Sequence, residues 1–456
     1  MYVYCNIKRR KSQSKVFEID RKYAANAHRQ EKYNVFHKKI DICRQISYNI
    51  AMKNMQTYKT IIIGAGAAGL FLVNTLLQRG EKPSNILLID RMERVGRKLS
   101  ATGNGQGNVT NLSVAEEGYF SVQGKASAQR AQAIVREYSN AQLTAFFADL
   151  GVLLLPDDRG RVYPASRQAS ALTDALRFGA QNAPTLLSTT VTNIKKDGGR
   201  YAITAKIADG EQVFFAENVA LCTGGKAAKN FGTDGGAYAL ATAFSHTLTP
   251  LYPSLVQLKT ETAHTKTLKG IRVTDGKATV RFAGEEISLT GDIIFTDYGV
   301  SGDAIFRLSA YFADKIDGAT ISIDFLPNVS KAELSTLIQN KQSAYPTLDK
   351  AELLFGIVNN QIGRAIFRRA DGDIDRAISL VKDFPLKITG SLGFDYAQVT
   401  KGGIPLAETD ENLQSKYAKG LYFAGEILDV DGACGGFNLQ WAYASACKVA
   451  DGILQK

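Results

Sequence analysis

The chain has 456 residues, 45% of them hydrophobic, which is enough to bury the cores of two or three domains. No run of about 20 consecutive apolar residues occurs, so the composition argues against a transmembrane helix. The net charge is +11, but 13 of the 55 basic and 4 of the 44 acidic residues fall within residues 1–54, which leaves only +2 for the rest. The nearly neutral body argues against a nucleic-acid partner.

The basic segment 1–54 has neither the uninterrupted apolar run nor the small-residue cleavage site of a secretory signal. Met52 and Met55 lie just before the first predicted strand, so a chain starting at either would keep the whole fold. We interpret the segment as an upstream extension; a nucleic-acid arm or an organelle-targeting peptide is the alternative. Five separated cysteines without a Cys-x-x-Cys pair predict reduced thiols, no metal site and a cytoplasmic location.

A strand, a glycine-rich turn and a helix follow one another from residue 58. The β-branched run 58–63 precedes Gly64-Ala65-Gly66-Ala67-Ala68-Gly69 and an apolar stretch of helical character. Gly64 permits a sharp turn, Gly66 lets backbone amides approach a pyrophosphate, and Gly69 lets the helix pack closely on the sheet. The motif predicts a Rossmann-type dinucleotide site; a tight turn without a ligand is the alternative.

An acidic residue ends the second predicted strand, residues 86–89, about 20 residues after the glycines. This residue, Asp90, can accept hydrogen bonds from both hydroxyls of an adenosine ribose and would repel a 2′-phosphate. The site is therefore predicted to take FAD or NAD rather than NADP.

The segment after Asp90 is too rich in glycine and asparagine to form a regular helix or strand. It contains Gly103-Asn104-Gly105-Gln106-Gly107-Asn108, and Arg97 and Lys98 add positive charge just before it. We predict a loop wrapped around a ligand, with a flexible linker as the alternative.

Further elements are predicted in chain order. Residues 127–150 have helical periodicity, 185–195 predict a strand followed by a hairpin at 197–199, and 218–222 predict a buried strand ending in Thr223-Gly224-Gly225. That glycine turn, with the glycine-rich run 232–236 behind it, suits a second approach of the backbone to a nucleotide.

Residues 251–326 are rich in short alternating segments and predict an inserted β domain, in the form of a barrel. Residues 330–385 change to helical spacing, with Pro385 as the expected stop, and predict a small helical insert.

The C-terminal part returns to the pattern of a dinucleotide fold. A strand closes on Gly425-Glu426, and Gly435, Gly436 and Asn438 lie at the predicted start of the last helix. Free amides at that helix terminus can stabilise negative charge on a reduced flavin. Because the chain has one complete glycine motif and no second unit for NAD(P)H, FAD held by both ends of the chain fits best.

These segments resemble the BaiN-like family of FAD-dependent oxidoreductases, also called aminoacetone-oxidase-like, over roughly residues 56–456. The resemblance rests on residues 97–111, 295–302, 399–404 and 425–441. It implies an α/β fold in which a Rossmann-like FAD-binding domain is interrupted by a β-barrel domain and a small helical domain. The predicted boundaries are 1–54 for the extension, 55–250 and 391–456 for the FAD-binding domain, 251–329 for the barrel and 330–390 for the helical insert.

One departure from the family lies in the glycine loop. Many members have Gly-Arg-Cys-Asn where this chain has Gly105-Gln106-Gly107-Asn108. A role that the arginine or cysteine has elsewhere in the family therefore cannot operate here.

The resemblance implies a two-electron flavin reaction, with members that reduce 3-oxo-Δ4,6 bile-acid intermediates, reduce ribosomal uridine to dihydrouridine, or oxidise aminoacetone. We expect an oxidoreductase acting on CH–CH bonds, with a 3-oxo-Δ4,6 bile acid or steroid as small-molecule substrate and NAD(P)H as the transient reductant. Uridine reduction and amine oxidation are the enzymatic alternatives. An FAD-binding redox sensor and an RNA-associated protein using its basic extension are the alternatives outside enzymology. The sequence predicts no oligomeric state.

Candidate catalytic residues are Asp297 and Tyr298, in a turn that matches the family and where an acid or a hydrogen-bond donor can face the substrate. A helix-cap role for Asp297 and a packing role for Tyr298 are the alternatives. His246 and His264 are expected to be structural, and Trp441 to pack behind the cofactor. The predicted cofactor-binding residues are Gly64, Ala65, Gly66, Ala67, Ala68, Gly69, Asp90, Arg91, Arg97, Lys98, Gly103, Asn104, Gly105, Gln106, Gly107, Asn108, Val191, Thr223, Gly224, Gly225, Gly425, Glu426, Asp429, Gly435, Gly436, Phe437 and Asn438.

Overall fold

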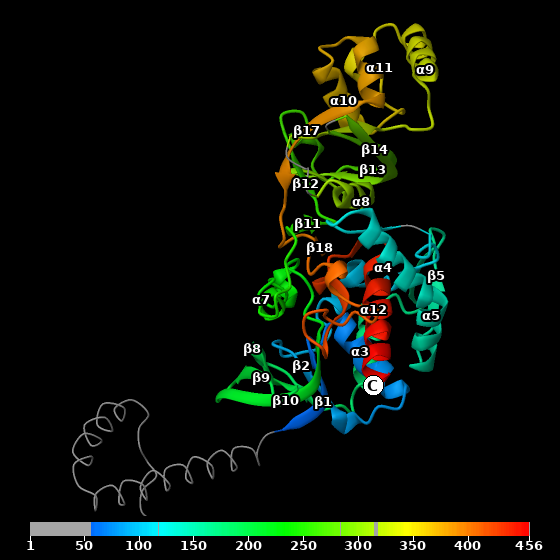
Figure 1. Ribbon diagram of the computed structural model, residues 1–456. Helices are drawn as coiled ribbons and strands as arrows, with labels where there is room; N and C mark the ends of the chain where they lie inside the picture. Colours follow the sequence, from blue (N-terminus) through cyan, green and yellow to red (C-terminus); the bar gives the residue numbers. More distant parts are fainter. Residues whose placement is uncertain (1–55, 117, 283, 314–317, 456) are drawn as a thin grey trace, which may run out of the picture. The chain divides into compact units, whose positions relative to one another are not determined.

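The computed structural model describes residues 56–116, 118–282, 284–313 and 318–455 (Figure 1). The predicted extension, residues 1–54, lies outside the described residues, and the interpretation of it stays a prediction. Among the residues that the structure describes, no helix is long and apolar enough to cross a membrane.

A seven-stranded sheet forms the centre of the first domain. Its strands follow the order β7-β2-β1-β10-β9-β8, and β19 pairs with the far end of β10. The strands are β1 (Thr57–Ile63), β2 (Ile86–Ile89), β7 (Thr185–Leu186), β8 (Thr190–Asp197), β9 (Arg200–Ile207), β10 (Gly210–Leu221) and β19 (Leu421–Phe423). The pairs β1/β2, β2/β7 and β10/β19 are parallel, whereas β8, β9 and β10 form an antiparallel meander. The predicted Rossmann core is therefore present.

The strand predicted over residues 185–195 is in fact two strands. β7 pairs with β2, and β8 pairs with β9. Ser188 lies between them with a positive φ of 50°, which a β-strand does not accommodate. The break turns residues 187–189 out of the sheet.

Two long helices pack side by side against this sheet (Figure 1). They are α3 (Ala67–Gln78), which follows the glycine turn, and α12 (Phe437–Leu454), which ends the chain. Phe71 of α3 contacts Tyr443 of α12 edge to face, with ring centroids 5.5 Å apart. The two ends of the described chain thus share one apolar core.

The helical stretch predicted over 127–150 divides into α4 (Lys125–Glu137) and α5 (Asn140–Asp149). Ser139 starts the second helix: its hydroxyl accepts a hydrogen bond from the Gln142 amide, and the Gln142 side chain bonds back to the Ser139 amide. This capping box is visible in the sequence and outweighs the continuous periodicity.

The remaining elements of this domain are short. They are α6 (Ala169–Gly179), α7 (Tyr238–Thr242), a small sheet of β3 (Thr110–Asn111), β6 (Arg161–Pro164) and β5 (Leu154–Pro156), and the pair β20 (Asp431–Gly432) with β4 (Tyr119–Phe120).

A closed six-stranded barrel forms the inserted domain, as predicted. Around the barrel its strands are β12 (Leu258–Thr260), β15 (Gly299–Ser301), β14 (Glu285–Phe295), β13 (Arg272–Phe282), β16 (Thr320–Asp324) and β17 (Phe384–Ser391), with α8 (Asp303–Tyr311) packed against it. Two further strands, β11 (Tyr252–Ser254) and β18 (Val399–Lys401), pair antiparallel where the chain leaves the first domain and where it returns.

The helical insert lies between β16 and β17 and comprises α9 (Lys331–Ala344), α10 (Asn360–Arg369) and α11 (Ile374–Lys382). Because β17 closes the barrel, the segment 330–390 predicted as helical contains a barrel strand. Phe384, Leu386 and Ile388 are buried in it and Lys387 is exposed, a period-two pattern that Pro385 conceals because proline usually interrupts strands. The helices and the barrel share one apolar core.

Two glycines of the motif that follows β1 bring backbone segments into close contact. A Cβ added at Gly64, whose φ is +103°, would lie 2.4 Å from the carbonyl oxygen of Cys222, and one at Gly69 would lie 1.9 Å from that of Gly64. α3 can therefore pack on the turn only without these side chains.

We predict that Gly69→Ala lowers the free energy of unfolding by roughly 2–4 kcal/mol, because α3 must move away from the Gly64 carbonyl. Gly66→Ala is the matched control, since a Cβ there meets no atom within 4 Å and its φ is −77°. Urea unfolding of both ligand-free proteins, followed by circular dichroism, measures the difference. Equal transition midpoints would contradict the packing argument.

Candidate nucleotide-binding site

A cavity of about 510 Å³ lies at the carboxyl ends of β1, β2 and β10. This is the edge of an open α/β sheet at which ligands characteristically bind. Of the predicted site residues, the structure brings the following to its wall: Gly64, Ala65, Gly66, Ala67, Ala68, Asp90, Arg91, Arg97, Lys98, Val191, Thr223, Gly224, Gly225, Gly425, Glu426 and Asn438.

The first turn of α3 faces this cavity with free backbone amides. Gly66 is its N-terminal capping residue, and no side chain caps the helix start. Space is open around the Gly66 Cα. An anion can therefore approach the positive end of the helix without displacing protein atoms.

Asp90 is fixed at the end of β2 by two backbone donors. One of its carboxylate oxygens accepts a hydrogen bond from the Ala65 amide at 2.6 Å, and the other accepts one from the Met92 amide at 2.7 Å. Burial raises the pKa of Asp90, and these bonds with the charges of Arg91 and Arg97 oppose that rise. Each oxygen keeps a second acceptor position, which suits a pair of ribose hydroxyls.

The three predicted cations are all engaged with the protein. The Arg91 guanidinium bonds the Gly232 carbonyl and the Asp234 carboxylate, and Arg97 bonds the carbonyl of Asn230. The Lys98 ammonium lies 2.7 Å from Glu426. Their charge at the cavity is therefore shared with protein acceptors.

Glu426 connects the cavity to the strand that returns from the barrel. While one of its oxygens pairs with Lys98, the other accepts the Thr400 amide of β18 at 2.9 Å. A Cβ at Gly225 would lie 2.8 Å from that second oxygen and 2.4 Å from the Thr400 hydroxyl. The glycine is thus required for this close approach.

One buried side-chain polar atom of the cavity wall has no hydrogen-bond partner. It is the hydroxyl oxygen of Thr223, in the turn after β10. A buried hydroxyl is costly unless something satisfies it. With the open helix start and the two spare acceptor positions of Asp90, it makes a wall that fits the ribose and diphosphate of a dinucleotide. Trp441, which is buried, lines the same cavity and donates its indole N–H to the Gly425 carbonyl at 3.1 Å.

The predicted glycine loop does not line the cavity. Residues 103–106 are exposed, and Gly103, Asn104 and Gly105 have positive φ. The Asn108 side chain is buried and donates to the carbonyls of Thr110 and Val162, both at 3.0 Å. These residues shape the chain beside the cavity, and a contact with the cofactor stays a prediction.

Five more predicted residues lie outside the cavity wall: Gly69, Asp429, Gly435, Gly436 and Phe437. Asp429 accepts hydrogen bonds from the Ser121 hydroxyl and from the amides of Val122 and Gln123. A Cβ at Gly436 would lie 2.3 Å from the Thr110 carbonyl, so this glycine lets α12 start against β3.

Several wall residues were missed by the sequence analysis. They include Met92, Thr102, Thr189, Thr190, Thr192, Phe231, Ala237, Leu439 and Ala442. The glycine-rich run 232–236, which the sequence connects with a second approach to a nucleotide, does line the cavity. The threonines near residue 190 gave none, because small polar residues in a strand are common at any surface.

The two catalytic candidates lie on the barrel and not at the cavity. Asp297 is exposed and 2.8 Å from the Lys269 ammonium, which holds the pKa of that carboxyl below its usual range. Tyr298 is half-buried, burial raises the pKa of its hydroxyl, and its carbonyl accepts the Thr260 amide at 3.0 Å.

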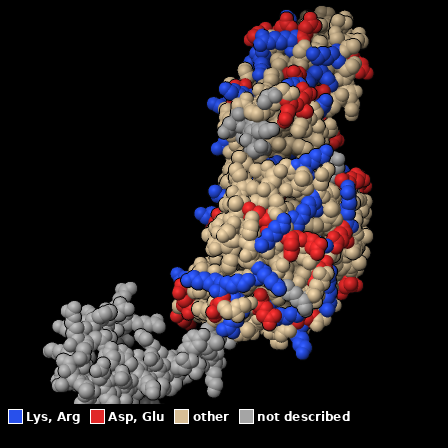
Figure 2. All heavy atoms as spheres, in the orientation of Figure 1, with Lys and Arg blue, Asp and Glu red and all other residues tan. Residues whose placement is uncertain are grey.

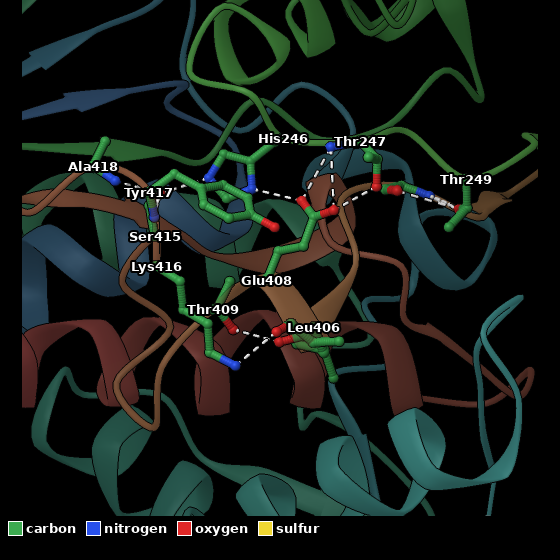
Figure 3. Close-up of polar contacts among 12 residues, drawn as sticks. His246, Thr247, Thr249, Leu406, Glu408, Thr409, Ser415, Lys416, Tyr417 and Ala418 are labelled. Carbon is green, nitrogen blue, oxygen red and sulfur yellow. Dashed lines mark hydrogen bonds and ion pairs between the residues drawn. The ribbon is translucent and has the colours of Figure 1, made fainter.

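Ser415, His246 and Glu408 lie in the order of a serine-hydrolase triad (Figure 3). His246 Nε2 is 2.7 Å from the Ser415 hydroxyl, and Nδ1 is 2.8 Å from Glu408. The Ser415 oxygen, however, accepts the amides of Tyr417 and Ala418, and all three triad-like side chains are buried. The cluster therefore ties chain segments together and does not present a nucleophile.

A family model described as the HI0933-like protein Rossmann domain matches residues 58–452. The chain is 31% identical over 403 residues to the 3-dehydro-bile acid delta(4,6)-reductase of Clostridium scindens, a match that covers 84% of this chain and 96% of that protein. It is 28% identical over 425 residues to the ribosomal RNA dihydrouridine synthase of Escherichia coli, covering 88% and 99%. The predicted family resemblance is thereby confirmed.

Among solved structures, the chain is similar to 3-ketosteroid delta1-dehydrogenase from Sterolibacterium denitrificans. The TM-score is 0.42 at 13% identity, covering 88% of this chain and 99% of that one.

The buried His246 gives a testable pH dependence. Burial lowers its pKa, against the opposing effect of Glu408. The folded state therefore binds the proton less readily than the unfolded state, whose histidine pKa is about 6.5. The contribution of His246 to the free energy of unfolding is therefore complete above about pH 6.5 and is lost as the pH falls below that value.

We predict that His246→Gln costs less unfolding free energy at about pH 5.5 than at about pH 7.5, in urea titrations at both pH values. His264→Gln is the control, because that histidine is exposed and its replacement should cost the same at both. An equal cost of His246→Gln at the two pH values would show that the imidazole is not held neutral.

Proposed function

Because the chain belongs to the HI0933-like family, we propose that it is an FAD-dependent oxidoreductase that reduces an activated C=C bond. The observation that carries this proposal is the match to the bile acid delta(4,6)-reductase, at 31% identity over almost the whole of that relative. We propose a 3-oxo-Δ4,6 bile acid or a related steroid as substrate and NAD(P)H as the source of electrons.

The cavity supports FAD as the cofactor through its ADP half. Asp90 holds the adenosine ribose, and the free amides around Gly66 at the start of α3 hold the diphosphate. The unpartnered Thr223 hydroxyl supplies one further polar contact. Trp441 and Leu439 close the wall on the α12 side.

The start of α12 supports the redox half of the cofactor. Asn438 and Leu439 line the cavity, and no side chain caps this helix, so its positive end is free to stabilise negative charge. Bound FAD would supply hydride transfer to the β-carbon of the enone. Because Asp297 is exposed and paired with Lys269, we propose no proton-donor role for it.

Reduction of ribosomal uridine is the second candidate. It is favoured by relatives from Escherichia coli and Haemophilus influenzae, 28% and 26% identical, both named ribosomal RNA dihydrouridine synthase. The C5=C6 bond of uracil is conjugated to a carbonyl and would accept hydride as an enone does. On the face shown in Figure 2, basic and acidic side chains are interspersed, whereas RNA binding favours a one-signed basic surface.

We predict that the purified protein carries bound FAD and that Gly66→Val lowers the bound flavin by roughly tenfold or more, because its methyl groups would enter the space beside the α3 amides. The ratio of flavin absorbance to protein absorbance measures the loss. Circular dichroism checks that the variant is folded. Full flavin content in folded Gly66→Val would contradict this placement of the diphosphate.

The substrate class is tested anaerobically. The flavin is reduced with NADH or NADPH, and a 3-oxo-Δ4,6 bile acid, a uridine-containing ribosomal RNA fragment and aminoacetone are then added separately. We expect the bile acid to reoxidise the flavin fastest. Reoxidation by the RNA fragment or by aminoacetone alone would replace the proposed substrate, and reoxidation by none of the three would favour a redox sensor.

A further inference from the structure

We call residues 229–236 the strap; its residues 231–236 line the cavity, as does the segment that follows β2. Two arginines of that segment reach across to it. We propose that these arginines latch the strap over the adenosine end of the cavity, so that FAD is released only when the latch opens. The inference rests on the proposed function to the extent that the occupant is FAD.

Three hydrogen bonds make the latch. Arg91 Nε donates to the Gly232 carbonyl at 2.7 Å, and a second Arg91 nitrogen donates to the Asp234 carboxylate at 3.0 Å. Arg97 donates to the Asn230 carbonyl at 3.0 Å. Because the arginines and the strap both line the cavity, these bonds join two of its walls.

The latch lies at the solvent edge of the site. The side chains of Arg91 and Asp234 are 35% and 39% exposed. An ion pair with this exposure is worth little on its own and is screened by salt. It can therefore break at a modest free-energy cost, as a reversible closure requires.

The strap is anchored at its beginning, and in its middle the Thr233 hydroxyl also donates to the Ala227 carbonyl at 2.5 Å. Just before it, the Ala228 amide donates to the Phe394 carbonyl at 2.8 Å, which fixes that residue in a left-handed conformation with φ +63°. Within the strap, Gly232 and Gly235 also have positive φ. In the proposed opening, the segment that contains these glycines moves and the Thr233 bond breaks with the latch, while Ala228 stays in place.

Asp234 is not among the predicted cofactor-binding residues. Its replacement therefore tests the latch separately from any direct contact with the cofactor. It would act through Arg91 as a positioning residue, because its carboxylate orients the guanidinium and its other oxygen accepts the Gly236 amide at 2.9 Å. An arginine that instead bound the diphosphate directly would not need this carboxylate. The two mechanisms therefore differ in what Asp234→Asn does.

The test measures the rate at which FAD leaves the holoenzyme after dilution, followed by the rise in free-flavin fluorescence. The variants are Arg91→Ala, Asp234→Asn and the double variant. Arg177→Ala is the matched control, since Arg177 pairs with Asp174 at 3.1 Å in an exposed contact on α6 that is not part of the cavity wall.

We expect Arg91→Ala to raise the release rate roughly 5- to 10-fold and Asp234→Asn roughly 2- to 5-fold. The double variant should release FAD no faster than Arg91→Ala, because Arg91→Ala already breaks the bond that Asp234→Asn weakens. Added salt should speed release from the unchanged protein and much less from Arg91→Ala. Arg177→Ala should match the unchanged protein.

Two results would overturn the latch while leaving the proposed function intact. Release rates unchanged in both single variants would show that the strap does not limit exit. Acceleration by Arg91→Ala with no effect of Asp234→Asn would show that Arg91 acts directly on the cofactor. A purified protein that binds no flavin would instead overturn the proposed function and the latch together.

Discussion

The architecture of the site depends on backbone segments that touch without side chains between them. At Gly64 the turn after β1 lies against the carbonyl of Cys222, and at Gly69 helix α3 lies against that turn. Larger residues there would separate the carboxyl ends of β1 and β10, and the cavity is formed by those ends. The contact therefore sets the distance between the helix amides and Thr223 on the other wall.

The charged side chains around this contact are paired with other groups of the protein. Lys98 is neutralised by Glu426, and Arg91 and Arg97 are bonded to the strap. Apart from the largely exposed Arg94, the groups that face the cavity are a helix terminus, a carboxylate with spare acceptor positions and one unsatisfied hydroxyl. Such a wall selects a ligand by hydrogen-bond geometry and by the helix field more than by net charge. This suits the diphosphate of FAD, which joins an adenosine ribose to a ribityl chain.

The sequence predicted the features that local rules control. The glycine turn, Asp90, the barrel and the helix start at Gly436 all follow from periodicity and from residue types that few other contexts require. The sequence assigned β17 to the helical insert because Pro385 obscured the alternation of buried and exposed residues. It predicted one strand over 185–195 because the residue types do not indicate the positive φ of Ser188. The bonds of Arg91 to residues over 140 positions away depend on tertiary packing, which no local pattern encodes. The exposure of residues 103–106 also depends on tertiary packing, so the sequence did not predict it.

Glu426 also connects the nucleotide-binding domain to the strand that returns from the inserted domain. Its carboxylate holds Lys98 of the nucleotide-binding domain with one oxygen and the Thr400 amide, on the strand returning from the barrel, with the other. The Thr400 hydroxyl in turn accepts the amides of Lys226 and Ala227 after the second Gly-Gly turn. The strand that returns from the inserted domain therefore orients Glu426, a residue of the cavity wall. A chain trimmed to residues 55–250 and 391–456 would keep the glycine motif and Thr400 but would lose β11, the strand that pairs with β18, so the two domains cannot be separated cleanly at β18.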